Sequence, residues 1–117
     1  MIIFYWLPHC STCRKAVEYL ETNGATIAES RDIKSNPLSR SEVQNLAEMV
    51  GGASELFSRR AIKYRAMTLN ERVLSSEEMI ELMAEEYTFI KRPVVVSEGH
   101  AVSGFTPKSF DRFLEQI

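Results

Sequence analysis

In the first third of the chain, the spacing of the apolar residues changes from that of a strand to that of a helix and back to that of a strand. This pattern limits the folds that the chain can adopt. A dense β-branched and aromatic run at residues 2–6 is too short for a helix and is typical of a buried central strand. Apolar side chains then recur at helical spacing over residues 12–23, where Asn23–Gly24 favours a helix end. Residues 26–33 are short, moderately β-forming and bounded by turn residues. These segments predict a β-α-β unit with parallel strands.

The middle of the chain is predicted to be helical. Residues 39–42 form a capping-box pattern that begins an apolar helical repeat, and this repeat ends at Gly51–Gly52. Residues 54–67 are mixed and basic and predict short helical turns. Residues 75–78 cap a further helix with its own apolar face.

The last part of the chain returns to strands and closes on a helix. Residues 94–103 predict a tight hairpin around Glu98–Gly99, and Thr106–Pro107 begins the closing helix. The order β-α-β, helices, β-β-α predicts an α/β fold that is thioredoxin-like (glutaredoxin-like), with a mixed sheet and an all-helical insertion at about residues 38–88. We expect a single domain over residues 1–117, with a core of residues 1–36 and 89–117 and an insertion of residues 37–88.

Length, charge and cysteine content narrow the class of protein. The chain has 117 residues, and its 14 Lys and Arg against 16 Asp and Glu lack the basic excess of a nucleic-acid binder. No apolar run approaches the roughly 18 residues that span a bilayer. Two cysteines without an export signal indicate a reducing compartment. We therefore expect a cytoplasmic protein with no direct contact to nucleic acid or membrane, and we expect a monomer.

Two cysteines, Cys10 and Cys13, stand where the first strand ends and the first helix begins. The N–H groups and the dipole at a helix start stabilise a thiolate, and Arg14 and Lys15 add positive charge. The three-residue spacing also allows a disulfide between the two sulfur atoms. We expect Cys10 to attack as a thiolate and Cys13 to resolve the intermediate.

The residues around the cysteines leave other roles open. A CxxC pair is also half of a zinc site, which His9 and His100 would complete. A third interpretation is a pair of buried structural thiols. Ser11 and Thr12 are candidate anion ligands, because their backbone amides would hold an oxyanion above the helix start.

Longer stretches of the chain resemble a known family. The CxxCRKA motif and the KRP motif before a strand are specific in this order and spacing, and the resemblance extends over almost the whole chain. It is carried by residues 4–5, 10–16, 56–60, 63–65 and 90–95. On these residues the chain is identified as a member of the ArsC/Spx/MgsR family. The resemblance implies a thioredoxin-like fold with Pro93 as a cis-proline opposite the reactive cysteines, so we predict a cis Arg92–Pro93 bond.

The arsenate reductases of this family attack arsenate with one cysteine, hold the oxyanion with three arginines and draw electrons from glutathione with glutaredoxin. The resemblance assigns the nucleophile to Cys10 and one arginine to Arg92, whose guanidinium would also lower the thiol pKa. The other two reductase arginines have no counterpart in this chain. Ser58 stands near the position of one of them, and residues 102–105, near the position of the other, carry no guanidinium. Arg60 is a weaker candidate for anion binding.

The first hypothesis is therefore an arsenate reductase-like thiol-disulfide oxidoreductase. Its substrate would be a small oxyanion or a disulfide, and Cys13 or an external thiol would resolve the intermediate. Glutathione/glutaredoxin or thioredoxin would be the external reductant, with no bound cofactor and no metal.

The CxxC pair also resembles Spx and MgsR, which have a different function. In Spx this pair is a redox switch on a protein that binds RNA polymerase rather than DNA. Gly52 falls where Spx has a glycine in its polymerase-contacting surface, although a glycine there is also typical of a helix end. The alternative hypothesis is a redox-sensing regulator that acts through RNA polymerase by a Cys10–Cys13 disulfide.

Overall fold

The computed structural model describes residues 1–117, and its contacts divide the chain into two compact units. The first unit joins residues 1–36 to residues 92–117, and the second is residues 37–91. This division follows the predicted core and insertion, but it falls after residue 91 rather than after residue 88. The reason is a backbone contact within the second unit: the Lys91 N–H donates to the Leu56 carbonyl at 2.8 Å.

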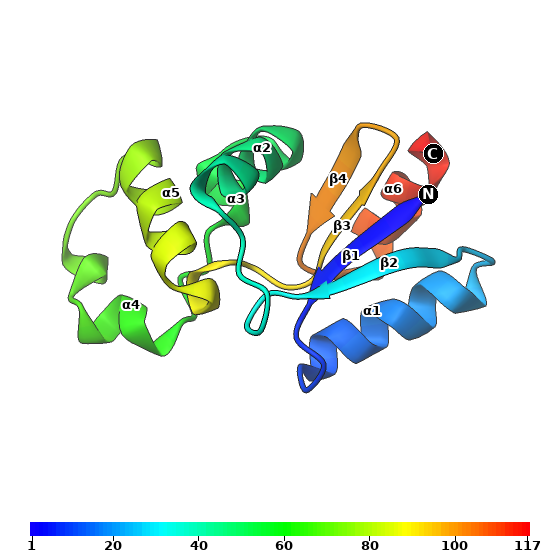
Figure 1. Cartoon of the computed structure of the whole chain (residues 1–117), viewed down its shortest axis with the longest axis horizontal. Helices are drawn as coiled ribbons and strands as arrows, with labels where there is room; N and C mark the ends of the chain where they lie inside the picture. The colour runs from blue at the N-terminus through cyan, green and yellow to red at the C-terminus, as the bar shows by residue number, and fades with distance from the viewer. The chain divides into compact units, whose positions relative to one another are not determined.

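The first unit is built on a four-stranded sheet with the order β2-β1-β3-β4 (Figure 1). Its central strand, β1 (Ile2–Trp6), pairs in parallel with β2 (Ile27–Asp32) and antiparallel with β3 (Val94–Ser97). β3 forms a hairpin with β4 (His100–Ser103). The predicted parallel β-α-β start and the hairpin are both confirmed, and together they make the mixed sheet of a thioredoxin-like fold.

Two helices, α1 (Ser11–Thr22) and α6 (Pro107–Gln116), cover one face of this sheet. Side chains alternate along a strand, so Ile2 and Phe4 share a face. These two side chains lie in one buried cluster with residues of both helices. The buried members of the cluster are Ile2, Phe4, Cys13, Ala16, Leu20, Val95, Phe110 and Phe113. Cys13 is therefore part of the hydrophobic core.

The second unit consists of helices and turns, with one isolated antiparallel β-bridge between Phe57 and Ile90. Its main helices, α2 (Arg40–Val50) and α5 (Ser76–Glu85), both begin with the predicted capping boxes. The remaining elements are short: α3 (Ala53–Leu56), α4 (Ile62–Ala66) and the 3-10 turns η1 (Leu69–Glu71) and η2 (Tyr87–Phe89). The Phe57 ring stacks on Phe89 with ring centroids 5.3 Å apart, which gives this unit a core of its own. No helix in the chain has the length and apolar character needed to cross a bilayer.

Candidate active site

Cys10 occupies the N-cap position of α1, directly after the turn that follows β1. Its backbone is extended, with φ −82° and ψ 119°, so the chain changes from strand to helix at this residue. The Cys10 N–H donates to the Leu7 carbonyl at 3.1 Å, and the Cys10 carbonyl accepts the first helical hydrogen bond from Arg14 at 3.1 Å. These bonds hold the half-buried Cys10 side chain over the N-terminal end of the helix.

The pKa of Cys10 is lowered from its ordinary value, although burial acts in the opposite direction and is the largest cause. The lowering comes from hydrogen bonds to the sulfur by the backbone N–H and the thiol of Cys13 and by the backbone N–H of Thr12. The positive charge of Arg92 adds to it. A thiolate is stabilised by donors and by nearby positive charge, so Cys10 is suited to act as a nucleophile.

Cys13 has the opposite character, although it lies one helical turn away. Its side chain is fully buried in the core cluster of the first unit. Burial raises the pKa of this thiol to about 12, and the hydrogen bond to Cys10 and the negative charge there act in the same direction. Near neutral pH Cys13 is therefore a neutral S–H group that donates to the Cys10 sulfur.

Arg92 reaches the cysteines because of the strand register. In the antiparallel pair, Val94 of β3 lies opposite Tyr5 of β1, so the residues before Val94 run beside the C-terminal end of β1. The Arg92–Pro93 peptide bond is cis, as predicted. The Arg92 side chain is half-buried, and its Nε atom is buried. Its positive charge acts to lower the pKa of both cysteines, but at Cys13 burial outweighs this effect.

The other predicted site residues divide between the two units. Ser11 and Thr12 form the first turn of α1 and are exposed, and of their two amides it is the Thr12 N–H that hydrogen-bonds to Cys10. The backbone N–H of Cys13, which the sequence analysis did not select, lowers the Cys10 pKa more than the Thr12 N–H does. Arg60 is an exposed turn residue of the second unit, and its role in anion binding stays a prediction.

The zinc interpretation lacks a ligand set. No group of three or more His, Cys, Asp and Glu side chains comes close enough together anywhere in the chain to hold a metal ion. A structural zinc site uses four such ligands. The interpretation as a pair of buried structural thiols fits only Cys13, which is fully buried, because Cys10 is half-buried.

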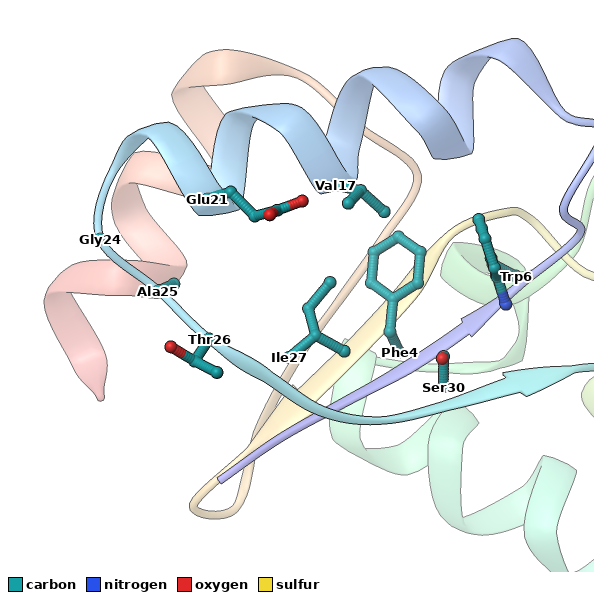
Figure 2. A pocket seen from close by; sticks show the side chains of 9 residues that line it. All are labelled: Phe4, Trp6, Val17, Glu21, Gly24, Ala25, Thr26, Ile27 and Ser30. Atoms are coloured by element: carbon teal, nitrogen blue, oxygen red, sulfur yellow. The ribbon is translucent and has the colours of Figure 1, made fainter.

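A groove beside α1 is a second feature of the first unit, and the sequence did not predict it (Figure 2). It has a volume of about 570 Å³. Figure 2 shows Phe4 and Trp6 from β1 and Val17 from α1 on its apolar side, with Ser30 of β2 beside them. The sequence clue is the small polar Ser30 opposite Phe4, because a larger apolar residue there would fill the space.

Comparison with known proteins identifies the family. The model of the ArsC family matches residues 5–113. The uncharacterized protein YusI of Bacillus subtilis (strain 168) is 35% identical over 113 residues, which cover 94% of this chain and 95% of YusI. The global transcriptional regulator Spx of the same strain is 29% identical over 115 residues, covering 97% of this chain and 87% of Spx. The crystal structure of a possible arsenate reductase from Streptococcus mutans UA159 has a TM-score of 0.76 and 34% identity, and covers 95% of this chain and 98% of that chain. Because the family model matches residues 5–113, which is almost the whole chain, the chain belongs to the ArsC family.

Proposed function

We propose that this protein is a thiol-dependent oxidoreductase that resembles arsenate reductase and uses the Cys10 thiolate as its nucleophile. The observation that carries the proposal is the lowered pKa of Cys10 beside a neutral Cys13. This arrangement provides one sulfur that attacks the substrate and a second, protonated sulfur that can resolve the intermediate. Membership of the ArsC family supports the same class of chemistry.

With a disulfide substrate, the reaction has two steps. The Cys10 thiolate attacks one sulfur, forms a mixed disulfide and releases the other sulfur as a thiolate. Cys13 then loses its proton and attacks the Cys10 sulfur, which forms the Cys10–Cys13 disulfide and releases the second substrate thiol. The two cysteines lose two electrons and the substrate gains them. Glutaredoxin with glutathione, or thioredoxin, then reduces the Cys10–Cys13 disulfide.

The first step prepares Cys13 for the second. While Cys10 is a thiolate, its charge and its hydrogen bond both raise the pKa of Cys13. The mixed disulfide carries no negative charge on Cys10, so these two causes disappear and Cys13 ionises more easily. Cys13 therefore becomes a better nucleophile only after Cys10 has reacted.

With arsenate, Cys10 would form a sulfur–arsenic bond with loss of hydroxide. A second thiol, either Cys13 or glutathione, would then attack the Cys10 sulfur, and arsenic would leave with the bonding electron pair as arsenite. Arg92 is the positive group near the nucleophile, and its planar guanidinium matches an oxyanion. Arsenate would thus be held by Arg92 and by the amides at the start of α1.

The test is arsenate-dependent oxidation of NADPH, coupled in separate reactions to glutathione with glutaredoxin and to thioredoxin. We expect turnover with one of the two reductants and none in Cys10→Ser. A wild-type protein that shows no turnover with arsenate or with a small disulfide under either coupling would contradict the proposal.

Cys13→Ala is the matched variant that identifies the resolving thiol. If Cys13 resolves the intermediate, this variant stops with a disulfide substrate after one mixed disulfide per chain, which mass spectrometry of the intact protein detects. If glutathione resolves it, turnover with glutaredoxin persists in Cys13→Ala.

The second candidate is a redox-sensing regulator that binds RNA polymerase, which the 29% identity to Spx supports. The specific observation in its favour is that Cys13 is positioned to form a disulfide, while two of the three reductase arginines have no counterpart. Capture of RNA polymerase by the immobilised protein, compared in reducing and oxidising buffer, tests it. Capture that depends on redox state and is lost in Cys13→Ala supports the regulator, and equal or absent capture excludes the switch.

A further inference from the structure

The groove beside α1 lies entirely within the first unit, and none of its nine lining residues belongs to the candidate active site. The lining comes from β1, α1, β2 and the turn that joins the helix to β2 (Figure 2). Its volume of about 570 Å³ falls within the roughly 300 to 1,000 Å³ of sites that bind small molecules. A ligand in this groove would therefore occupy a different site from a substrate of Cys10, whatever reaction Cys10 carries out.

The apolar wall of the groove is formed by three half-buried side chains, namely Trp6 from β1, Val17 from α1 and Ile27 from β2. Each of them keeps part of its surface open to solvent, and an apolar ligand would cover that surface. The Trp6 ring is held in place by an edge-to-face contact with Phe4, with ring centroids 5.7 Å apart and ring planes at 65°. Because aromatic rings pair favourably in such geometries and a fixed wall loses little side-chain freedom on binding, this wall favours a ligand with an aromatic ring.

Glu21, in the last turn of α1, is the one charged side chain that lines the groove. Its carboxylate makes no ion pair and no hydrogen bond within the chain. The residues three and four positions before it on the helix, Glu18 and Val17, carry no positive charge that could reach it. Figure 2 shows Glu21 and Trp6 at opposite ends of the groove. The carboxylate is therefore available to a positive charge on a ligand whose apolar part lies against the wall.

We propose that this groove binds a small organic amine that carries an aromatic ring. The ring packs against Trp6, and the protonated amine lies beside the Glu21 carboxylate. An organic anion of the same shape is repelled by Glu21, and a neutral ligand leaves the carboxylate without a partner, so the charge of the groove selects the cation. The small side chain of Ser30, opposite Phe4 in the strand register, keeps the space open for the ring.

The preference for a cation is expected to be modest, because the Glu21 side chain is exposed. An exposed ion pair changes an affinity by roughly two- to fivefold. Salt screens this contribution but not the apolar contacts, so the preference for an amine over a neutral ligand should shrink as ionic strength rises. A single-ring amine is expected to bind with a dissociation constant of about 1 mM.

Titration of the whole chain, labelled with nitrogen-15, by three ligands of one shape tests the proposal. The ligands are 2-phenylethylamine, its neutral counterpart 2-phenylethanol and the anion 3-phenylpropionate. Two-dimensional NMR spectra follow the backbone amides and the indole N–H of Trp6, the single tryptophan of the chain. We expect saturable shifts that are concentrated at the groove, with the amine bound roughly two- to fivefold more tightly than the alcohol at low salt and the anion bound most weakly.

Two variants with matched controls separate the charge from the cavity. Glu21→Gln should reduce the affinity for the amine to that for the alcohol, whereas Glu18→Gln, exposed on the same helix, should keep the preference. Ser30→Leu should fill the groove and abolish binding of both ligands, whereas Ser35→Leu, outside the groove, should leave binding unchanged.

Three results would overturn the proposal. The first is the absence of saturable shifts at the groove up to about 10 mM amine. The second is equal affinity of the wild type for the amine and the alcohol at low salt. The third is a preference for the amine that persists in Glu21→Gln, because the positive charge would then be recognised elsewhere.

Discussion

At the residue scale, Cys10 and Cys13 show how position separates two identical side chains. Cys10 is half-buried at the N-cap, where backbone N–H groups reach its sulfur. Cys13 is one turn further along α1, on the helix face that packs into the core. The pKa of Cys10 is lowered and the pKa of Cys13 is raised to about 12, so Cys10 ionises at a lower pH than Cys13 and is the better nucleophile of the two.

The first prediction concerns the contribution of Arg92 to the Cys10 thiolate. The rate of alkylation by iodoacetamide, measured against pH by mass spectrometry, should have its midpoint below the ordinary thiol pKa of 9.0. Arg92→Met should raise this midpoint because it removes a positive charge, while Arg92→Lys should largely preserve it. Arg14→Met is the matched control: although the sequence led us to expect a contribution from Arg14, this exposed side chain is not among the main causes of the lowered Cys10 pKa, so the variant should have little effect. A midpoint that is the same in Arg92→Met and wild type would show that Arg92 does not stabilise the thiolate.

The second prediction concerns stability in alkaline solution. In the unfolded chain Cys13 loses its proton near 9.0, whereas in the folded protein it keeps the proton up to about 12. Between these values the unfolded state binds fewer protons, so the free energy of unfolding falls as pH rises, by up to about 1.4 kcal/mol per pH unit.

Urea denaturation on both sides of pH 9.0 measures this slope. Cys13→Ala serves as the reference, because it keeps the other groups that titrate in this range. The wild type should lose stability with pH more steeply than Cys13→Ala. Parallel slopes for the two proteins would contradict the raised pKa.

At the element scale, the second unit depends on a sharp turn between α2 and α3. Gly51 ends α2 with φ 105° and ψ 9°, and Gly52 follows with φ 134° and ψ 162°. The Gly52 N–H donates to the Ala47 carbonyl at 2.7 Å, which completes the helix end. The Gly52 conformation is accessible almost only to glycine, because a Cβ atom clashes with its own backbone there.

The third prediction follows from this turn. Gly52→Ala should lower the free energy of unfolding by about 1 to 3 kcal/mol, and Gly51→Ala should cost about 1 to 2 kcal/mol. Glu48→Ala, on the exposed face of α2, should stay within about 0.5 kcal/mol of wild type. The transition followed by circular dichroism measures all three. If Gly52→Ala is as stable as Glu48→Ala, the backbone does not require glycine at this position.

This result also bears on the regulator hypothesis. A Gly52 variant that fails to capture RNA polymerase is informative only when its stability is known. Loss of capture in a variant that remains folded would assign a contact role to Gly52, in addition to its role in the turn.

At the scale of the whole molecule, the two units differ in how the chain builds them. The second unit is one continuous segment, residues 37–91, so all of its contacts join residues of that one segment. The first unit needs β1 to pair with β3, which begins at Val94, so the chain must close a long loop before this sheet is complete. Contacts distant in sequence form more slowly than local ones.

The fourth prediction is an order of folding. During refolding followed by pulsed hydrogen exchange, the backbone amides of α2 and α5 should become protected before those of β3. The reason is that β3 pairs with a strand from the other end of the chain, whereas α2 and α5 lie in one segment. Simultaneous protection of β3 and the two helices would show that the units fold together.

The local patterns of the sequence determined most of the elements and the position of the cysteine pair. The capping boxes at Ser39 and Ser75 and the Thr106–Pro107 helix start are all present in the structure. Cys10 was assigned to the junction of strand and helix, where it lies. These features were predictable because each depends on residues within about one helical turn of one another.

The tertiary structure alone decided the features that depend on distant parts of the chain. Strand pairing brings Arg92 beside the first turn of α1, and core packing buries Cys13 and raises its pKa. The same pairing leaves β2 at the edge of the sheet and opens a groove above Ser30. A sequence pattern specifies which face of an element is apolar. How deeply a side chain is buried, which charges lie near it and which strand lies at the edge of the sheet depend on how distant elements pack together. The sequence determined the two sulfur atoms and their spacing, and the packed fold decided that the pKa of Cys10 is lowered while that of Cys13 is raised.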